Sequence, residues 1–547
     1  MRSILKDSSL ISSEEAIEKF KLVPKPRMKE KEIPLDEALG RVISRDIYSP
    51  IDLPSFSRST VDGYAVKSSC TPSSFTLKGK INIGENSKIS IDTCEEAVEV
   101  DTGAMIPEGA DAVVKVEDVE VIEGKIIVKN KVSFGLNVGW IGSDLPAGIK
   151  AIRKGTLVSP EVIGLLSAMG KTKVYVFAKP KVTVISTGDE LVPPGEELTL
   201  GKVYESNMFY LKAALSEDGF EVLNLEQVKD DYEAIKNAIS SAVETSDLVI
   251  TTGGTSAGER DYVYRVINEL GQMIFHGIKF KPGKPTFLGL IRGVPVVGLP
   301  GNMVSSVMVY RKIVRPASRL LFNAQIKENS TLEAISLIDV KADSKRFTYV
   351  PVLLLRKGNE YFALPLKFDS YMIGTFSMAH GYIGLTEGSY VKEGEKIKVE
   401  VTSFHDDPVI IGEEDPLLTN LDASVYPLGS YPAIKMLEHN VGDLLVISSL
   451  YKKPSHFDLE IKRDLVTNGN GSCVGYDDWV SLSKLVNNPS IKLKYRSLAP
   501  RFIGKAKVIS NDAFIKGEKI GEEKIYFVAL TDKGIDLVKV IKNKIEN

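Results

Sequence analysis

The chain reads Thr251-Thr-Gly-Gly-Thr-Ser-Ala-Gly-Glu-Arg-Asp261, then Lys281-Pro-Gly-Lys-Pro285, and then Gly298-Leu-Pro-Gly-Asn302. Each of these glycine-rich segments is reached from an apolar run, and together they carry hydroxyls, carboxylates, lysines and an asparagine. Loops of this kind can bring backbone N–H groups and positive charge against a phosphorylated ligand. We therefore expect this part of the chain to form the rim of an active site.

Strand-like and helix-like runs alternate around these loops. The pattern predicts strands at 181–186, 221–225, 248–252 and 295–299, and helices at 206–218, 231–245, 262–270 and 304–322, with Ser206 or Asn207 as a cap. Such alternation implies a mostly parallel sheet covered on both faces. Because ligands bind at the carboxyl ends of the strands in such sheets, the glycine-rich loops lie where a site is expected.

Two other parts of the chain show β patterning. Strand-like runs separated by glycines occupy 75–136 and 330–404, which predicts a small β domain in each. Helical periodicity predicts further helices at 12–23, 34–48 and 160–170. Residues 406–547 mix short strands and helices. The predicted fold class is a multidomain α/β protein, with about three to five domains for a chain of this length.

Composition places the chain among folded soluble proteins. It is 43% hydrophobic and 26% charged, and its net charge of -3 gives no case for nucleic-acid or membrane binding. No stretch approaches the about 20 apolar residues of a membrane span, and the N-terminal residues lack the apolar core of an export signal. Cys70, Cys94 and Cys473 are widely separated, so we expect no metal site and no disulfide framework, as in a reducing cytoplasm.

Two adjacent carboxylates follow the strand predicted at 181–186. The segment reads Ser186-Thr-Gly-Asp-Glu190. Mg²⁺ is commonly bound by one or two carboxylates together with oxygens of the ligand. An ordinary turn with solvated acids explains the segment equally well on its own, but the loop at 251–261 favours a functional site.

The loop at 253–258 has the chemistry of a phosphate loop without the usual signature. It offers glycine backbone and two hydroxyls, but no Gly-Lys-Ser or Gly-Lys-Thr follows. Asp261 can cap the next helix, contact a ligand, or do both. Lys281 and Lys284 stand on a proline-stiffened turn, which suits a phosphate or another oxyanion, although a lone lysine is usually solvated surface.

Taken together, seven segments closely resemble the molybdopterin molybdenumtransferase family, called MoeA in bacteria and fused within gephyrin in animals. They are Ser59-Thr-Val-Asp-Gly-Tyr-Ala-Val66, Thr102-Gly-Ala-Met-Ile-Pro-Glu-Gly-Ala-Asp-Ala-Val-Val114, Ser186-Thr-Gly-Asp-Glu-Leu191, Val228-Lys-Asp-Asp231, Thr252-Gly-Gly-Thr-Ser-Ala-Gly-Glu-Arg-Asp-Tyr262, Lys281-Pro-Gly-Lys-Pro285 and Gly298-Leu-Pro-Gly-Asn302. They occur in the family's order, and the resemblance covers about residues 10–404.

The resemblance implies an elongated protomer and a homodimer. The implied domains are a discontinuous first domain (1–47 and 148–178), a β-rich domain (48–147), an α/β molybdopterin-binding domain (179–326) and a small β barrel (327–404). The implied active site forms between the α/β domain of one subunit and the β-rich domain of the other. Asp62 and Thr102, far away in sequence, would then belong with the loops at 186–302.

The implied reaction uses adenylylated molybdopterin, molybdate and Mg²⁺, hydrolyses the adenylate and releases AMP. By resemblance, the catalytic residues are Asp62, Thr102, Glu190, Asp230 and Asp261, and the metal ligands are Asp189, Glu190 and Asp261. The implied substrate-binding residues are Ser186, Thr187, Gly188, Gly253, Gly254, Thr255, Ser256, Gly258, Lys281, Lys284, Pro300, Gly301 and Asn302. Mg²⁺ and clustered positive groups stabilise charge that develops on a phosphoryl group or an oxyanion.

The chain departs from the family's pattern at two places. Gly139 and Trp140 stand where members usually carry arginine, and tryptophan cannot grip an anion with two hydrogen bonds as arginine does. Met303 stands where a proline usually follows Gly-Asn. Both changes bear on anion affinity and activity rather than on the fold.

Residues 405–547 resemble a reduced form of a periplasmic-binding-protein-like domain. The similarity rests on Glu413-Glu-Asp-Pro416 and on the segment from Leu428 to Val446. Gly429-Ser430 would start a helix whose N-terminus can bind an oxyanion, while a plain capped helix explains the pair as well. The segment is short for a two-lobed binding domain.

The best-supported hypothesis is a cytoplasmic, Mg²⁺-dependent molybdopterin molybdenumtransferase. One alternative is an enzyme like molybdopterin adenylyltransferase, but that enzyme is the α/β domain alone, and here the β domains argue against it. Such an adenylyltransferase is also a candidate partner. A non-catalytic molybdopterin-binding scaffold is the second alternative. Tungstate can replace molybdate as the oxyanion, because the two ions have nearly the same size and charge.

Overall fold

A computed structural model of the chain describes residues 9–25, 28–86, 88–255, 262–322, 329–404, 407–469, 473–486, 489, 491–503 and 506–546. The chain forms two compact units. The large unit comprises Met1–Pro24, Lys181–Leu321 and Ile326–Asn547, and the small unit comprises Lys25–Pro180 and Phe322–Gln325. Every helix among the described residues is too short or too polar to span a membrane.

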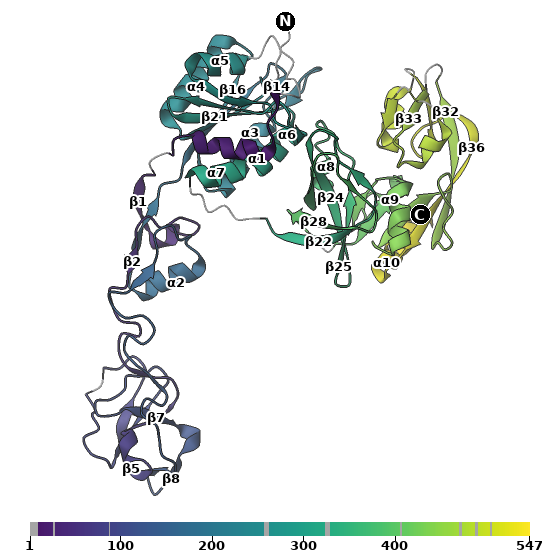
Figure 1. Ribbon diagram of the computed structural model, residues 1–547. Helices are drawn as coiled ribbons and strands as arrows, with labels where there is room; N and C mark the ends of the chain where they lie inside the picture. The colour runs from purple at the N-terminus through teal and green to yellow at the C-terminus, as the bar shows by residue number, and fades with distance from the viewer. Residues whose placement is uncertain are drawn as a thin grey trace. The chain divides into compact units, whose positions relative to one another are not determined.

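A six-stranded sheet forms the centre of an α/β domain in the large unit (Figure 1). The sheet order is β16-β13-β17-β21-β20-β18. The first four strands pair in parallel, and β20 pairs antiparallel with both of its neighbours, β21 and β18. The strands are β13 (Lys181–Thr187), β16 (Glu221–Val228), β17 (Leu248–Thr252), β18 (Gln272–His276), β20 (Phe287–Ile291) and β21 (Val294–Leu299). All of β17, and all of β13 except Lys181, is buried, as in parallel sheets covered on both faces. The predicted mostly parallel sheet is confirmed.

Helices cover both faces of this sheet. They are α1 (Ser13–Lys19), α3 (Asn207–Glu217), α4 (Tyr232–Thr245), α5 (Tyr262–Leu270), α6 (Met303–Val309) and α7 (Arg315–Phe322), with a π-helical stretch Tyr310–Val314 between the last two. α4 and α5 pack together and bury Ile239 and Val263 against one face, while α3 and α6 lie on the other (Figure 1). A short parallel pair, β14 (Leu191–Val192) and β15 (Val203–Tyr204), follows β13. The alternation read from the sequence therefore holds along this domain.

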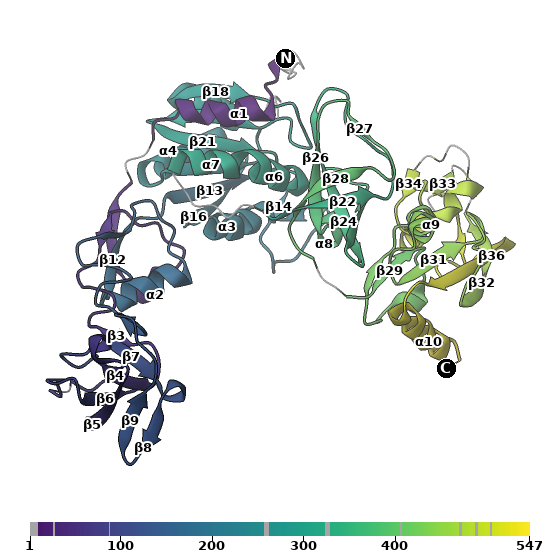
Figure 2. The ribbon, with the colours of Figure 1, turned by 60° about the horizontal axis from the view of Figure 1, so that its bottom comes forward.

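A closed β barrel follows the α/β domain (Figure 2). The order β19-β24-β25-β22-β28-β26 closes because β26 pairs with both β28 and β24. The barrel elements are β19 (Phe280–Lys281), β22 (Thr331–Ser336), β24 (Phe347–Lys357), β25 (Glu360–Pro365), α8 (Thr375–Met378), β26 (Gly381–Leu385) and β28 (Lys396–Val401), with β23 (Val340–Lys341) and β27 (Tyr390–Val391) paired beside them. The predicted β patterning of 330–404 is confirmed.

The last part of the chain, which we call the tail, holds an eight-stranded mixed sheet. Its order is β30-β29-β31-β36-β32-β35-β33-β34. The tail elements are β29 (Val409–Gly412), β30 (Ser424–Tyr426), α9 (Ser430–His439), β31 (Leu444–Ser448), β32 (Leu459–Asn468), β33 (Cys473–Tyr476), β34 (Ile491–Leu493), β35 (Lys507–Asn511), β36 (Glu518–Ala529) and α10 (Asp532–Glu546), with 3-10 turns at Pro416–Leu418, Ser481–Leu485 and Arg496–Phe502. The predicted helix start at Gly429-Ser430 is confirmed.

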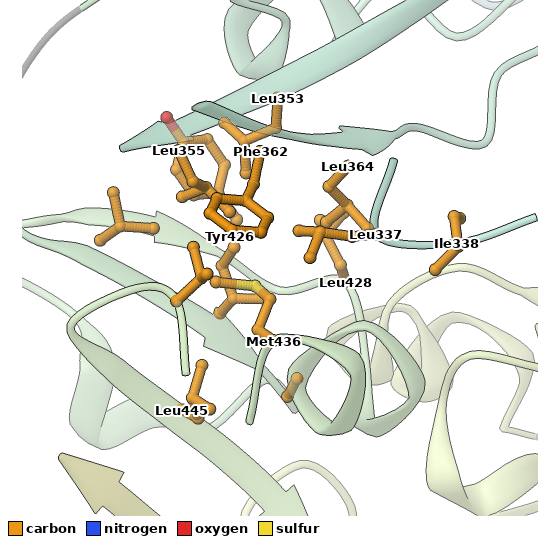
Figure 3. Close-up of a cluster of buried hydrophobic side chains, with 14 of the residues drawn as sticks. Leu337, Ile338, Leu353, Leu355, Phe362, Leu364, Tyr426, Leu428, Met436 and Leu445 are labelled. Atoms are coloured by element: carbon orange, nitrogen blue, oxygen red, sulfur yellow. The ribbon is translucent and has the colours of Figure 1, made fainter. Parts of the chain in front are cut away.

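The barrel and the tail share one apolar core (Figure 3). Leu355 and Phe362 of the barrel lie in the same cluster as Leu428, Met436 and Leu445 of the tail, and all five are buried. Burial of apolar area contributes about 25 cal/mol per Å², so side chains of this size fix the tail against the barrel.

The small unit holds a third six-stranded sheet, with the order β7-β4-β6-β5-β9-β8. Its elements are β1 (Glu30–Pro34), β2 (Ile47–Tyr48), β3 (Arg58–Ser59), β4 (Gly63–Val66), β5 (Ser73–Ile81), β6 (Glu96–Val100), β7 (Ala112–Lys115), β8 (Glu120–Ile122), β9 (Lys125–Val128), β10 (Val138–Gly139), β11 (Lys150–Ile152), α2 (Pro160–Ala168) and β12 (Lys173–Phe177), with 3-10 turns at Leu35–Glu37, Ser68–Cys70 and Val116–Asp118. The β patterning predicted for 75–136 and the helix predicted for 160–170 are both confirmed.

The expectation that the chain has no disulfide is wrong. Cys70 and Cys94 form a disulfide, with their Cα atoms 5.3 Å apart. Each cysteine lies just before one of two neighbouring parallel strands, β5 and β6, so the strand pairing brings them to the same end of the sheet. Parallel pairing joins segments that are distant in sequence, and cysteine spacing alone could not reveal it.

Two expectations for the N-terminal region also differ from the structure. The predicted helix at 34–48 is only a 3-10 turn at Leu35–Glu37, because Ile43 is buried in a bridge to Val176 rather than on a helix face. The helix expected at 12–23 begins at Ser13 with Ser12 as its cap, but it ends at Lys19 and continues as a 3-10 turn, Phe20–Leu22. It belongs to the large unit, where Ile11 pairs with Ile278, and not with residues 25–47.

Candidate active site

A cavity of about 730 Å³ lies at the carboxyl ends of the parallel strands. Its walls are the loops that follow β13, β17 and β21, the start of α3, and a loop of the barrel. The predicted site residues that line it are Thr187, Gly188, Glu190, Asp230, Gly253, Gly254, Thr255, Pro300, Gly301 and Asn302. The topology therefore brings together residues that span more than 100 positions in the sequence.

The loop after β13 places a hydroxyl and a carboxylate on the cavity wall. Thr187 is 4% exposed, and its hydroxyl has no hydrogen-bond partner among the described residues. Gly188 has a φ of +156°, and a Cβ there would lie 2.8 Å from a carboxylate oxygen of Glu190. A buried polar group without a partner costs free energy, so the Thr187 hydroxyl is poised to bond to a ligand.

The loop after β17 approaches the first loop so closely that only glycine fits. Gly253 and Gly254 have φ values of +84° and +58°. A Cβ on Gly253 would lie 2.3 Å from the carbonyl oxygen of Thr187. The predicted residues Ser256, Gly258 and Asp261 lie outside the described residues.

Replacement of Gly253 by alanine should lower the free energy of unfolding of the large unit by about 1–3 kcal/mol, because a strained φ and a backbone clash act together. Gly201 is a matched control: its φ is +86°, but no atom lies within 4 Å of the position of its Cβ. Chemical denaturation of Gly253→Ala and Gly201→Ala separates the clash from the dihedral cost. Equal losses in the two variants would mean that the loops can move apart.

The loop after β21 is tied to α3 and to the barrel. The Asn207 amide donates to the carbonyl of Gly301 at 2.7 Å, and the Asn302 amide donates to the Ser370 hydroxyl at 3.3 Å. The Asn207 side-chain oxygen is buried and has no partner among the described residues. Asn207 therefore offers a second unsatisfied polar atom on the cavity wall.

Several residues of the wall were not predicted as site residues. Glu205 is 1% exposed and accepts from the Ser186 hydroxyl and, at 2.8 Å, from the N–H of Met208 at the start of α3. Ser206 and Asn207 were expected only as caps, yet Glu205 makes the capping bond. Ser370, Tyr371 and Ile373 come from the barrel. The acidic Tyr-Glu-Ser-Asn sequence before α3 could have drawn attention to Glu205, but nothing local marks the barrel loop.

Some predicted residues do not line the cavity. Ser186 lies behind it, where its hydroxyl accepts from that of Thr252 at 3.0 Å. Asp189 turns aside and accepts from the N–H of Asp230 at 3.3 Å. Lys281 pairs with Asp343 of the barrel at 3.2 Å. Lys284 is half-buried, and its neighbour Pro285, not Lys284 itself, is among the cavity's lining residues.

The charged groups around Lys281 hold a carboxylate firmly ionised. Hydrogen bonding from Arg346, together with that from Lys281, keeps the pKa of Asp343 well below its usual range.

His276 lies beside the glycine-rich loop. Burial lowers the pKa of His276, whose ring contacts the carbonyl of Thr255 at 3.2 Å. A neutral His276 therefore supports the end of the glycine-rich loop after β17.

Asp62 and Thr102 lie together in the small unit. Asp62 accepts from the N–H of Thr102 at 2.6 Å and from its hydroxyl at 2.9 Å. These two bonds lower the pKa of Asp62. Trp140, near the same strands, stacks on Phe134 with ring centroids 5.4 Å apart.

The acids of the large-unit cavity suit a hard cation completed by a ligand. Glu190 and Asp230 both line the cavity, whereas no group of three metal-binding side chains occurs among the described residues. Mg²⁺ needs only one or two carboxylates when substrate phosphate and water supply the other oxygens. The donor set fits such an ion.

The N-terminus of α9 in the tail already holds an anion of the chain itself. The Glu413 carboxylate accepts from the N–H of Ser430 at 2.9 Å, from its hydroxyl at 2.7 Å, and from the N–H of Ser481 at 2.8 Å. Glu413 also pairs with Arg496 at 2.9 Å, and all of these groups are buried. Of the two explanations for Gly429-Ser430, the structure therefore shows the capped helix. The Glu413 carboxylate occupies the position at the helix N-terminus that an oxyanion would take.

Three family models match successive parts of the chain. The MoeA N-terminal region (domains I and II) matches residues 11–170, a probable molybdopterin binding domain matches 183–319, and the MoeA C-terminal region (domain IV) matches 333–402. The last two ranges contain the cavity loops, and the first contains Asp62 and Thr102.

Curated relatives and a solved structure agree with these matches. The chain is 37% identical over 311 residues to the molybdopterin molybdenumtransferase of Haemophilus influenzae, covering 56% of this chain and 77% of the relative. It is 33% identical over 364 residues to a putative molybdopterin biosynthesis protein of Methanocaldococcus jannaschii, covering 63% of this chain and 90% of the relative. A molybdopterin biosynthesis MoeA protein from Pyrococcus horikosii superimposes with a TM-score of 0.63 at 36% identity, covering 72% of this chain and 99% of that one. The chain therefore belongs to the molybdopterin molybdenumtransferase family.

Proposed function

We propose that the chain inserts molybdenum from molybdate into adenylylated molybdopterin and releases AMP, as a transferase of molybdenum cofactor biosynthesis. The observation that carries the proposal is the cavity at the strand ends, with its two carboxylates and glycine-rich walls, in a chain with relatives named for this transfer. The role in cofactor biosynthesis follows from the family, and the details of ions and residues are part of the proposal.

The cavity offers three kinds of contact to an adenylylated pterin. Backbone N–H groups of the loop at Gly253 and Gly254 can approach phosphate closely, because no side chain intervenes. The Thr187 hydroxyl and the Asn207 side-chain oxygen are unsatisfied and can orient polar groups of the substrate. Substrate binding would supply the missing hydrogen bonds.

Mg²⁺ would be held by Glu190 and Asp230, with Asp261 as a further candidate ligand. When bound, the ion would stabilise negative charge on the phosphoryl oxygens of the adenylate. Asp189 orients Asp230 through the hydrogen bond to its N–H, so it acts in this proposal by positioning rather than by direct contact. Lys284 belongs to the proposed substrate-binding set, whereas Lys281 would first have to leave Asp343.

The proposed assembly is a homodimer in which Asp62 and Thr102 of one subunit complete the cavity of the other. Their mutual hydrogen bonds present the Asp62 carboxylate in a fixed orientation. We also propose a cytoplasmic location, which rests on the biosynthetic role of the relatives and no longer on cysteine usage, because Cys70 and Cys94 form a disulfide. Supply of the substrate by a molybdopterin adenylyltransferase belongs to the same proposal.

AMP release tests the function directly. The purified chain should release one AMP for each adenylylated molybdopterin consumed when Mg²⁺ and molybdate are present, and chelation of Mg²⁺ should stop the release. The same assay with tungstate measures the choice of oxyanion. Binding of the pterin without AMP release would instead support a scaffold, and consumption of ATP with plain molybdopterin would support an adenylyltransferase. Either result would overturn the proposal.

A further inference from the structure

A second cavity, of about 630 Å³, lies between the barrel and the tail. On the barrel side it is lined by the segment 371–375 and Met378. On the tail side it is lined mainly by Leu428, Trp479, Tyr495 and Leu498, with lysines at the edge. The size lies in the range of small-molecule sites, about 300–1,000 Å³. It borders the shared apolar core of Figure 3, which also contains Leu428.

One lysine of this cavity differs from its neighbours. Lys367 is paired with Asp477, and Lys492 is paired with Asp478 at 2.9 Å. Lys494, in contrast, forms no ion pair with any described residue, and its ammonium lies 5.3 Å from the centroid of the Tyr495 ring. Burial lowers the pKa of Lys494, although the nearby Asp477 opposes this. Asp477 also lines the cavity, but its ion pair is with Lys367. A half-buried ammonium that has no ion pair of its own can bind an anionic group of a ligand.

The other linings point to a flat, partly polar molecule. Tyr371, Trp479 and Tyr495 give the cavity three aromatic side chains. Thr375 is 3% exposed, and its hydroxyl has no hydrogen-bond partner among the described residues. Aromatic rings favour stacked or edge contacts with planar groups, and the buried hydroxyl can bond to a polar edge.

We propose that this cavity binds a planar organic anion, an aromatic or heterocyclic ring that carries a carboxylate or a phosphate. Lys494 meets the charge, Trp479 and the two tyrosines contact the ring, and Thr375 bonds to a polar atom of the ring or its substituent. An inorganic oxyanion leaves the apolar walls uncovered, and a neutral ring leaves Lys494 unpaired. The ligand class follows from the cavity and does not depend on the proposed reaction.

The occupant would also contact the active-site wall. Tyr371 and Ile373 line both the second cavity and the cavity at the strand ends. Their neighbour Ser370 accepts a hydrogen bond from Asn302. Binding in the second cavity should therefore slow hydrogen exchange in the segment 369–376.

Tryptophan fluorescence can test the site because the chain has two tryptophans. In Trp140→Phe the signal comes from Trp479 alone. AMP and pterin-6-carboxylate are the planar anions to titrate, with adenosine as a neutral ring and inorganic phosphate as an anion without a ring. We expect saturable quenching by at least one planar anion, with about 10-fold weaker binding of adenosine than of AMP if AMP is the better probe. No saturable quenching by either planar anion, or equal binding of adenosine, would overturn the proposal.

Variants that change the charge at Lys494 test whether this residue binds the anionic group of the ligand. In the same background, Lys494→Met should weaken binding of the better planar anion about 10-fold, whereas Lys494→Arg should retain it. Lys492→Met is the matched control, because Lys492 is exposed and already paired with Asp478. Unchanged binding in Lys494→Met would contradict the proposal. If Lys494→Met does not fold, Lys494→Arg and the comparison of AMP with adenosine still decide it. This test uses binding alone, so it can fail while the transferase assay succeeds, and the reverse.

Discussion

Replacement of Arg496 by methionine should lower the free energy of unfolding of the tail by about 3–5 kcal/mol, because two carboxylates would remain buried without their cation. Arg496 is 1% exposed. Its guanidinium bonds to Glu413 at 2.9 Å and to Glu523 at 2.7 Å and 2.8 Å. Since Glu413 also caps α9, the loss would reach both the helix and β36. Hydrogen exchange of the α9 and β36 amides measures the local free energy of opening.

Two comparisons make the Arg496 result decisive. Lys519→Met removes an exposed cation paired with Asp464, with both side chains about half exposed, and should change stability by less than about 1 kcal/mol. The combined variant Glu413→Gln, Glu523→Gln and Arg496→Met removes all three charges and should recover part of the loss. An equal loss in the single and combined variants would show that shape, not charge, is responsible.

The effect of Arg496→Met should also depend on pH. Burial raises the pKa of Glu523, but the charge and hydrogen bonds of Arg496 outweigh it, so the pKa lies below its usual range. A depressed carboxyl pKa contributes stability that is present above the pKa of the unfolded chain and is lost as the pH falls through the folded value. The difference between wild type and variant should therefore shrink toward acid pH.

Replacement of Glu190 by glutamine should reduce kcat/KM for AMP release about 100-fold or more, which corresponds to roughly 3 kcal/mol of transition-state stabilisation. Glutamine keeps the size of the side chain and removes the charge that would hold Mg²⁺. The apparent Mg²⁺ requirement should rise in the same variant. AMP release measured over a series of Mg²⁺ concentrations gives both quantities.

Glu197 provides the control for Glu190. Glu197 is exposed, follows β14 in the sequence and does not line the cavity. Glu197→Gln should keep the wild-type kcat/KM. Unchanged kcat/KM and an unchanged Mg²⁺ requirement in Glu190→Gln would exclude this carboxylate as a ligand in the reaction and redirect attention to Asp230 and to Asp261.

The α/β domain could be predicted from the sequence because its signals are local. Each strand, such as β17, is a short apolar run, each helix repeats its apolar face every three or four residues, and the glycine-rich loops follow the strand ends. The position of these loops at one edge then follows from the topology of parallel sheets. The fold of this domain and the position of the cavity could therefore be predicted from the sequence. Thr187, Gly253 and Asn302, which were predicted as site residues, line the cavity.

The remaining features depend on contacts between distant segments. Tyr371 reaches the cavity from a barrel loop whose Ser370 is hydrogen-bonded to Asn302. Lys281 forms an ion pair with Asp343 instead of lining the cavity. The disulfide between Cys70 and Cys94 requires the pairing of β5 with β6. Local periodicity contains no information on such partners. The prediction of a helix at 34–48 failed for the same reason, because Ile43 forms a β-bridge with Val176, a residue more than 100 positions away.

The core that the barrel shares with the tail has a consequence for shortened forms of the chain. Leu353, Leu355 and Phe362 are buried in that cluster beside side chains of the tail. A chain that stopped at residue 402, where the last family match ends, would turn these side chains toward water. Contiguous apolar faces of this kind drive self-association of soluble proteins. The tail thus keeps this apolar face of the barrel away from water, and a chain without the tail should self-associate through the exposed face.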